Sequence, residues 1–244
     1  MGGLVKGIRL MEAFDGTHSR MTLTEAARKA EVTPASARRC LLTLCQLGYL
    51  GSDGKHFWVS HGTLRFAHAY AASTRLPGLI QPILDAMCER TKESATLAVL
   101  DVDAAVVAAR SSSKKTMRVG LCVGSRMPLY CSATGRSLLV AMPDAAWREV
   151  VQRRPMVALT SRTETSLRGL AESLKLAVQN DYTICDQEVE IGVRAIAVPL
   201  RDRLGNTIAA VSVATRAERL TVSDLISQCL RTLRGAQEWS RTTF

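Results

Sequence analysis

Residues 33–48, TPASARRCLLTLCQLG, carry the clearest structural signal of the chain. Thr33 is placed to cap a helix, and Pro34 suits the first helical position because its missing N–H costs nothing there. Apolar side chains then recur at helical spacing, and Gly48 is typical of the residue that follows a helix. We expect these apolar side chains to form a buried stripe: Ala37, Leu41, Leu44 and Leu47.

The opposite face of this predicted helix is polar and basic. It carries Ser36, Arg39 and Thr43, with Arg38 at its edge. Side chains of these types hydrogen-bond base edges and phosphates when a helix lies in the major groove of DNA. The alternative is an ordinary solvated face, since an arginine pair on a surface helix is common.

The segments on both sides complete a DNA-binding motif. Before this helix, residues 4–14 have the apolar spacing of an amphipathic helix, and residues 24–30 indicate a short helix that Thr24 would cap. After it, two β-prone runs flank Asp53-Gly54, a strong hairpin signal, and Lys55 and His56 follow in the wing. This order of elements predicts a winged helix-turn-helix over residues 1–62 that binds double-stranded DNA.

Residues 63–76 have helical spacing again and are followed by Pro77-Gly78. We expect a linker helix in this segment. Its apolar side chains, with Phe66 and Tyr70 among them, would be buried best against a second copy. We therefore expect a homodimer, or a tetramer made of two dimers, through this helix or the first one.

The charge distribution agrees with a basic module joined to a larger domain. The 244 residues carry a formal net charge of +10; residues 1–75 hold ten Lys and Arg against five Asp and Glu, which is half of that excess. The longest apolar stretch, residues 95–109, is interrupted by Asp101 and Asp103, and the N-terminus lacks the apolar core of a signal peptide. We expect a cytoplasmic protein that makes no membrane contact.

Cysteine and histidine usage argues against metal and catalytic chemistry. The seven cysteines form no C-x-x-C pair, and all four histidines lie within the first 68 residues. The larger part of the chain therefore lacks the most common general base and transition-metal ligand. We expect no catalytic residues, no metal and no cofactor.

Residues 77–244 are expected to form an effector-binding domain of mixed α+β structure with an antiparallel sheet, similar to GAF and PAS domains. Strand-like runs occur at residues 96–100, 105–109, 117–123, 195–200 and 207–214. Helical spacing occurs at residues 79–90, 135–141, 144–153, 163–180 and 222–233.

One strand of this domain indicates a ligand cavity. Val211 and Val213 should face one way, whereas Ala210, Ser212 and Ala214 face the other and leave volume unfilled. Hydrogen-bonding groups of Thr134, Asp186 and Ser212 are candidates to line that volume. Arg194 is a candidate to hold a carboxylate in bidentate fashion, which favours a small anionic ligand. Alternatively, Arg194 is a surface residue paired with Glu188 or Glu190.

Several ordered motifs resemble the isocitrate lyase regulator (IclR) family of bacterial transcription factors. They are LTEAA at residues 23–27, ASARRCLLTLCQLGYL at 35–50, SRMPLYCSATGR at 125–136, DYTICDQE at 181–188, GVRAIAVPL at 192–200 and AAVSVA at 209–214. The resemblance covers nearly the whole chain. It implies a regulator that binds a palindromic operator and responds to a small acid. The runs at residues 37–39, 126–131 and 192–199 look most like the subgroup that controls protocatechuate, 4-hydroxybenzoate and β-ketoadipate catabolism.

The resemblance also implies where the effector binds. Its pocket residues correspond to Ala133, Thr134, Asp186, Ala195, Ser212 and Ala214, and Tyr130 precedes them in the same motif. The small-acid-binding prototype has Cys where Ala195 stands and Ser where Ala214 stands. Losing two polar groups implies a larger and less polar ligand, such as an aromatic acid.

Two other classes of function stay open on the sequence alone. One is an enzyme with a DNA-binding arm, although no Gly-rich phosphate loop, His-containing triad or metal spacing supports it. The other is a winged-helix scaffold that binds only protein partners.

Overall fold

The computed structural model describes residues 2–112 and 121–244. The chain divides into two compact units, Met1–Arg75 and Leu76–Phe244. Part of the strand expected over residues 117–123 lies outside the described residues, and residues 121–123 form no strand. Each unit is described by itself below.

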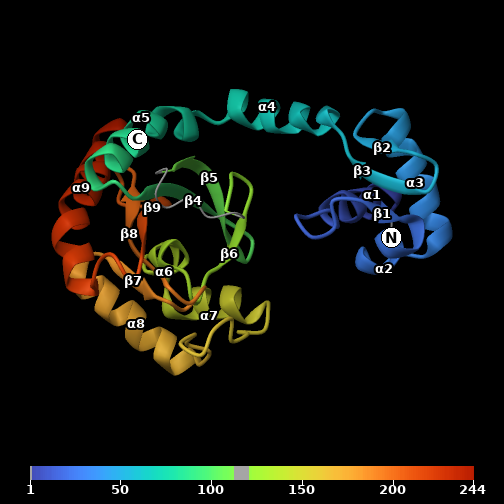
Figure 1. Cartoon of the computed structure of the whole chain (residues 1–244). Helices are drawn as coiled ribbons and strands as arrows, with labels where there is room; N and C mark the ends of the chain where they lie inside the picture. The colour runs from blue at the N-terminus through green and yellow to red at the C-terminus, as the bar shows by residue number, and fades with distance from the viewer. Residues whose placement is uncertain (1, 113–120) are drawn as a thin grey trace. The chain divides into compact units, whose positions relative to one another are not determined.

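The N-terminal unit packs three helices against a small antiparallel sheet (Figure 1). The helices are α1 (Gly3–Glu12), α2 (Leu23–Lys29) and α3 (Pro34–Gln46). The sheet has the order β1 (Met21–Thr22), β3 (His56–Val59) and β2 (Leu50–Ser52). Leu10, Ala26, Leu41 and Phe57 lie in the core that these elements share. The predicted winged helix-turn-helix is confirmed.

Helix capping in this unit agrees with one prediction and corrects another. Thr33 caps α3 as expected, because its Oγ1 accepts a hydrogen bond from the Ser36 N–H at 3.4 Å. Helix α2, however, is capped by Thr22 and not by Thr24: Thr22 and Glu25 form a reciprocal capping box. These bonds lower the pKa of Glu25. Thr24 lies inside the helix with its side chain exposed.

The segment after the wing is helical but ends earlier than expected. A short 3-10 turn (His61–Thr63) leads into α4 (Leu64–Ser73), and α5 (Arg75–Thr91) begins two residues later. Pro77 therefore lies in the first turn of α5 and does not terminate the preceding helix. A proline is tolerated there because the N–H groups of a first turn have no acceptor within the helix.

The C-terminal unit is built on a six-stranded antiparallel sheet. The strands lie in the order β6 (Arg126–Pro128), β5 (Ala104–Ser111), β4 (Ser94–Asp101), β9 (Thr207–Arg216), β8 (Val193–Arg201) and β7 (Thr183–Asp186). The helices are α5, α6 (Ala133–Leu139), α7 (Asp144–Gln152), α8 (Leu167–Asn180) and α9 (Val222–Thr243). The expected α+β domain with an antiparallel sheet is confirmed; β6 and β7 were not foreseen.

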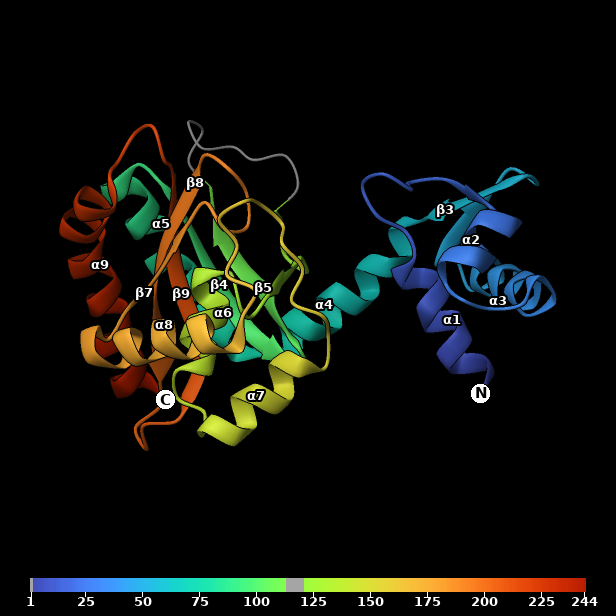
Figure 2. The same ribbon diagram turned by 90° about the horizontal axis from the view of Figure 1, so that it is seen from below.

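The two faces of this sheet carry different side chains. One face packs large aliphatic residues, including Ile196, Val198 and Val211, against α5 and α9. The other face packs small residues such as Ala98 and Ala210 against α6, which α7 and α8 cover in turn. Figures 1 and 2 show α6 between the sheet and α8. The sequence-based expectation that the last strand has one bulky and one small face is therefore correct.

Candidate functional site: a DNA-binding face and an effector face

Helix α3 presents three of the predicted DNA-binding side chains to solvent. Arg38, Arg39 and Thr43 are exposed, and the Thr43 hydroxyl donates a hydrogen bond to the Arg39 carbonyl at 2.9 Å. Ser36 is an exception, because it is only 6% exposed and accepts a hydrogen bond from Lys6 Nζ at 3.1 Å. It anchors α3 to α1, so its prediction as a surface residue is wrong.

The exposed face of α3 also contains residues that the sequence analysis missed. Leu42 is 43% exposed although it lies in the middle of the helix, and Gln46 is exposed one turn later. Leu47 is 56% exposed and does not belong to the buried stripe. An apolar side chain on a recognition helix can contact a thymine methyl group, and Gln pairs with adenine. Helical spacing from Arg39 would have identified Leu42 and Gln46 as part of this exposed face.

The wing is ordered by the carboxylate of Asp53. Its Oδ1 accepts hydrogen bonds from the N–H groups of His56 at 2.7 Å and Lys55 at 3.0 Å, and these bonds lower its pKa. The Lys55 side chain is exposed and that of His56 is half-buried. Arg20, which the sequence analysis did not single out, lies 3.5 Å from Asp53 Oδ2 and stacks over the Trp58 ring at 4.2 Å. The wing therefore gathers three basic side chains.

On the C-terminal unit, strand register brings together three of the expected effector residues. Ala195 lies opposite Ala214 and Ala197 lies opposite Ser212, while Cys185 lies opposite Ala195 on the next strand. Directly opposed residues point to the same face of an antiparallel sheet. Here that face is the one that α6 covers. Cys185 thus joins Ala195, Ser212 and Ala214, an assignment the sequence analysis missed.

The start of α6 borders this small-residue face. Ser132 caps the helix by accepting a hydrogen bond from Gly135 N–H at 3.1 Å. Ala133 packs against Cys185, and Thr134 is 2% exposed. Tyr130 is buried, and its hydroxyl donates to the Val157 carbonyl at 2.7 Å. Burial raises the pKa of Tyr130, so its hydroxyl stays protonated.

Asp186 and Arg194 do not lie with the other expected effector residues. They oppose each other in register, one residue away from Cys185 and Ala195, so they point to the opposite face of the sheet. Arg194 Nε donates to Asp186 Oδ1 at 2.8 Å and its Nη1 donates to the Leu220 carbonyl at 2.6 Å. The expectation that Arg194 shares the cavity with Ser212 is wrong. Arg194 forms its ion pair with Asp186, whereas Glu188 pairs with Arg136.

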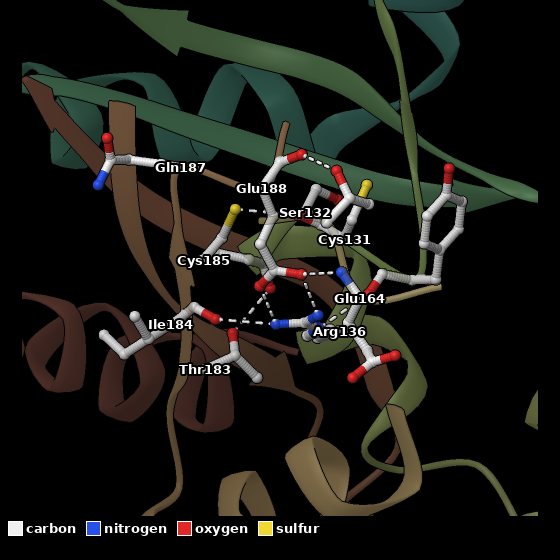
Figure 3. A network of polar contacts seen from close by, with 12 residues as sticks. Cys131, Ser132, Arg136, Glu164, Thr183, Ile184, Cys185, Gln187 and Glu188 are labelled. Atoms are coloured by element: carbon white, nitrogen blue, oxygen red, sulfur yellow. Dashed lines mark hydrogen bonds and ion pairs between the residues drawn. The ribbon is translucent and has the colours of Figure 1, made fainter. Parts of the chain in front are cut away.

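Glu188 instead forms a buried ion pair with Arg136 of α6. Two parallel hydrogen bonds of 2.6 Å join the Arg136 guanidinium to the Glu188 carboxylate (Figure 3). Arg136 Nε also donates to the Tyr130 carbonyl at 2.8 Å. Glu188 Oε2 accepts a hydrogen bond from the Glu164 N–H at 3.1 Å. These hydrogen bonds connect α6, the loop before α8 and the turn after β7.

The described residues contain no group of three or more side chains that could hold a metal ion. Asp186 and Glu188 are engaged by different arginines. Cys131 is fully buried, and burial raises its pKa to about 12, which opposes formation of a nucleophilic thiolate. Among the residues searched, no helix is both long and apolar enough to span a bilayer.

Family models match both units of the chain. The model of the IclR helix-turn-helix domain matches residues 3–54, and that of the bacterial transcriptional regulator IclR C-terminal domain matches residues 68–241. The chain is 36% identical to the Pca regulon regulatory protein of Pseudomonas putida, over 97% of this chain and 81% of the relative. It is 35% identical to the p-hydroxybenzoate hydroxylase transcriptional activator of Acinetobacter baylyi, over 96% of this chain and 89% of the relative.

Solved structures agree with this assignment. A Rhodococcus sp. RHA1 regulator is 33% identical and superimposes with a TM-score of 0.83 over 98% of this chain and 96% of its own. The inducer-binding domain of an Acinetobacter PobR double mutant, solved with 3-hydroxybenzoic acid, is 31% identical to this chain. Its TM-score is 0.64, over 69% of this chain and 98% of its own. These relatives are regulators and not enzymes, which removes the support for an enzyme with a DNA-binding arm. The chain belongs to the IclR family of bacterial transcriptional regulators.

Proposed function

We propose that this regulator senses an aromatic carboxylic acid and controls genes of aromatic-acid catabolism. The observation that carries the proposal is the small-residue face beside the start of α6, which consists of Cys185, Ala195, Ser212 and Ala214. Ala195 and Ala214 are half-buried although β8 and β9 are interior strands. Small side chains on that face leave room for a flat, largely apolar ligand. The names of the two relatives in the Pca and p-hydroxybenzoate pathways support the same ligand class.

The effector-binding residues in this proposal are those near the small-residue face. They are Tyr130, Ala133, Thr134, Cys185, Ala195, Ser212 and Ala214. Arg194 instead connects β8 to the loop before α9, because it donates a hydrogen bond to the Leu220 carbonyl. Asp186 is the ion-pair partner of Arg194. We propose that residues 1–62 form the DNA-binding winged helix-turn-helix, that residues 63–76, which contain α4, form the linker, and that residues 77–244 form the effector-binding domain.

For DNA, we propose that α3 enters the major groove. Arg38, Arg39 and Thr43, with Leu42 between them, would contact base edges and phosphates. The wing would contact the phosphate backbone through the basic side chains Arg20, Lys55 and His56. Thr24 and Thr33 lie exposed near the start of α2 and at the cap of α3, where a phosphate can approach backbone N–H groups.

A second copy of the chain would complete the DNA-binding form. The N-terminal unit has an apolar groove of about 970 Å³ between α1, α3 and α4, lined by Leu4, Ile8, Leu47 and Phe66 among others. Leu4 is 78% exposed and Phe66 is 61% exposed. Exposed apolar surface of this kind marks interaction sites. A homodimer, or a tetramer of two dimers, would cover it and place two recognition helices on a palindromic operator.

Ligand binding would act by biasing the effector domains between two arrangements that differ in DNA affinity. A thermal-shift screen with benzoate, hydroxybenzoates, protocatechuate and β-ketoadipate tests the ligand class. We expect aromatic acids to raise the melting temperature and A195L, which fills the small-residue face, to abolish the shift. A217L, placed just beyond β9 at a similarly half-buried residue, is the matched control and should keep it. Shifts of equal size in A195L and the wild type would contradict the proposed site.

A further inference from the structure

Strand β4 carries two hydroxyl side chains that the sequence analysis did not single out, Ser94 and Thr96. They are two residues apart and therefore point to the same face of the sheet. In register, Ser94 lies opposite Ala214 and Thr96 lies opposite Ser212. Both hydroxyls thus extend the small-residue face by one more strand, away from Cys185.

The Ser94 hydroxyl lacks the hydrogen-bond partner that buried polar groups normally have. Ser94 is 1% exposed, and its Oγ is buried without a hydrogen-bond partner. Thr96, 3% exposed, and Ser212, 6% exposed, are buried on the same face of the sheet. Most buried hydroxyls are hydrogen-bonded, and an unsatisfied one destabilises the fold. The unsatisfied Ser94 hydroxyl, with the buried hydroxyl residues Thr96 and Ser212 on the same face, therefore points to a ligand that supplies the missing partner.

Thr183 shows that an unsatisfied hydroxyl is not a general feature of this face. It belongs to the same row across the sheet, since it lies opposite Ala197, which in turn lies opposite Ser212. Its Oγ1 nevertheless donates to the Ala133 carbonyl at 2.7 Å and lies 2.7 Å from Ser137 Oγ. The Thr183 hydroxyl near α6 is thus satisfied within the protein, whereas the Ser94 hydroxyl on β4 is not.

We propose that Ser94 and Thr96 form the part of the effector site that recognises a ring hydroxyl of the bound aromatic acid. The inference rests on the proposed function, because it assigns a contact within that same site. From β4 to β8 the sheet spans two strand spacings, about 10 Å. A benzoic acid with a hydroxyl on the far side of its ring can extend over much of this distance. Its hydroxyl would donate to and accept from Ser94 and Thr96, with Ser212 alongside.

The test combines two variants with ligands that do or do not carry the hydroxyl. Isothermal titration calorimetry with the full chain would measure the affinities for 4-hydroxybenzoate, protocatechuate and benzoate. The proteins compared would be the wild type, S94A and T96V. We expect each variant to lose about 3- to 10-fold in affinity for the hydroxylated acids, the worth of one neutral hydrogen bond. Affinity for benzoate should change less than about 2-fold, because benzoate has no hydroxyl to lose. T96S keeps the hydroxyl and should bind like the wild type.

A matched control comes from the other end of β9. Thr207 Oγ1 is also buried without a hydrogen-bond partner, and T207V should leave all three affinities unchanged. Without ligand, S94A should melt no lower than the wild type, since it removes an unsatisfied group.

Three results would overturn the inference. The first is unchanged affinity of both variants for the hydroxylated acids while the wild type binds them; this result leaves the proposed function intact. The second is an equal loss for benzoate and the hydroxylated acids, which would indicate a packing effect. The third is a wild type that binds none of these acids, which would overturn the proposed aromatic effector as well.

Discussion

Removing the buried carboxylate of Glu188 should strongly destabilise the C-terminal unit. In E188Q, the Arg136 guanidinium would keep its charge but face a neutral amide in a site where Arg136 is 5% exposed and residue 188 is 9% exposed. Two charge-assisted hydrogen bonds of 2.6 Å would be weakened or lost. Breaking one partner out of a buried pair costs about 3–5 kcal/mol. The network also anchors the Glu164 backbone, so the loop before α8 should loosen with it.

Urea denaturation followed by Trp147 and Trp239 fluorescence measures this loss, with Trp58 replaced by Phe so that the N-terminal unit contributes no signal. The matched control is E172Q. It neutralises the Arg168–Glu172 pair, which is 3.2 Å long with side chains 91% and 67% exposed. Surface pairs of this kind contribute less than about 1 kcal/mol. We therefore expect a large decrease in unfolding free energy for E188Q and a very small one for E172Q.

The double variant R136M/E188L separates the cost of an unpaired charge from the value of the pair. It removes both charged groups, so it should recover part of the stability that E188Q loses. A loss below about 1 kcal/mol in E188Q would show that the Arg136–Glu188 pair does not stabilise the C-terminal unit, because an unpaired buried guanidinium is far more costly than that. A double variant that is less stable than E188Q would contradict the predicted cost of the unpaired charge.

Three further predictions concern the DNA-binding face, the cap of α2 and the buried thiol. R39A should weaken binding to a specific duplex by about 1–3 kcal/mol in an anisotropy titration at fixed salt, and R168A should not; equal affinities for R39A and wild type would exclude Arg39 from readout. T22A should destabilise the N-terminal unit by about 1 kcal/mol in thermal unfolding, whereas T24A should have less than half that effect, and the reverse order would contradict the capping box. Above pH 9 the unfolded state loses the Cys131 proton, whereas the folded state keeps it up to about pH 12, so stability falls with rising pH. C131A should reduce that fall by about 1.4 kcal/mol per pH unit in urea titrations, and an unchanged alkaline profile would refute it.

Local sequence signals predicted the order of the helices and strands in the N-terminal unit. The cap at Thr33, the proline after it and the Asp53-Gly54 turn act over a few residues, and the structure contains each of them. Thr24 was misplaced because Thr22 and Thr24 are both cap-forming residues, and only the reciprocal bond with Glu25 selects Thr22. Ser36 was misplaced because its partner, Lys6, lies 30 residues away.

The effector face was predicted only where a strand was recognised. The alternation of β9 correctly separated Ser212 from Val211. Strand β7 was not foreseen, so alternation was not applied to it, and Asp186 was assigned to the face that Cys185 occupies. Strand β4 was predicted from Thr96 onward. Its pairing with β9 depends on the order of the strands in the sheet, which neither segment indicates by itself. The sequence therefore could not predict that Thr96 lies opposite Ser212.

The Arg136–Glu188 pair illustrates the same limit. The two residues are 52 positions apart, and nothing near either of them indicates the partner. From the sequence, Glu188 was one possible partner of Arg194, and Arg136 was one arginine in a helix. Only the tertiary fold brings them to hydrogen-bond distance.

In the proposed function, an aromatic acid controls DNA binding by this chain. Fluorescence anisotropy with and without a saturating aromatic acid would measure the affinity of the full-length protein for a duplex that it selects from random sequence. We expect the acid to change the dissociation constant at least about 5-fold, a coupling free energy of about 1 kcal/mol, and A195L to remove this change. An acid that binds the protein but leaves the DNA affinity the same would contradict the proposed function.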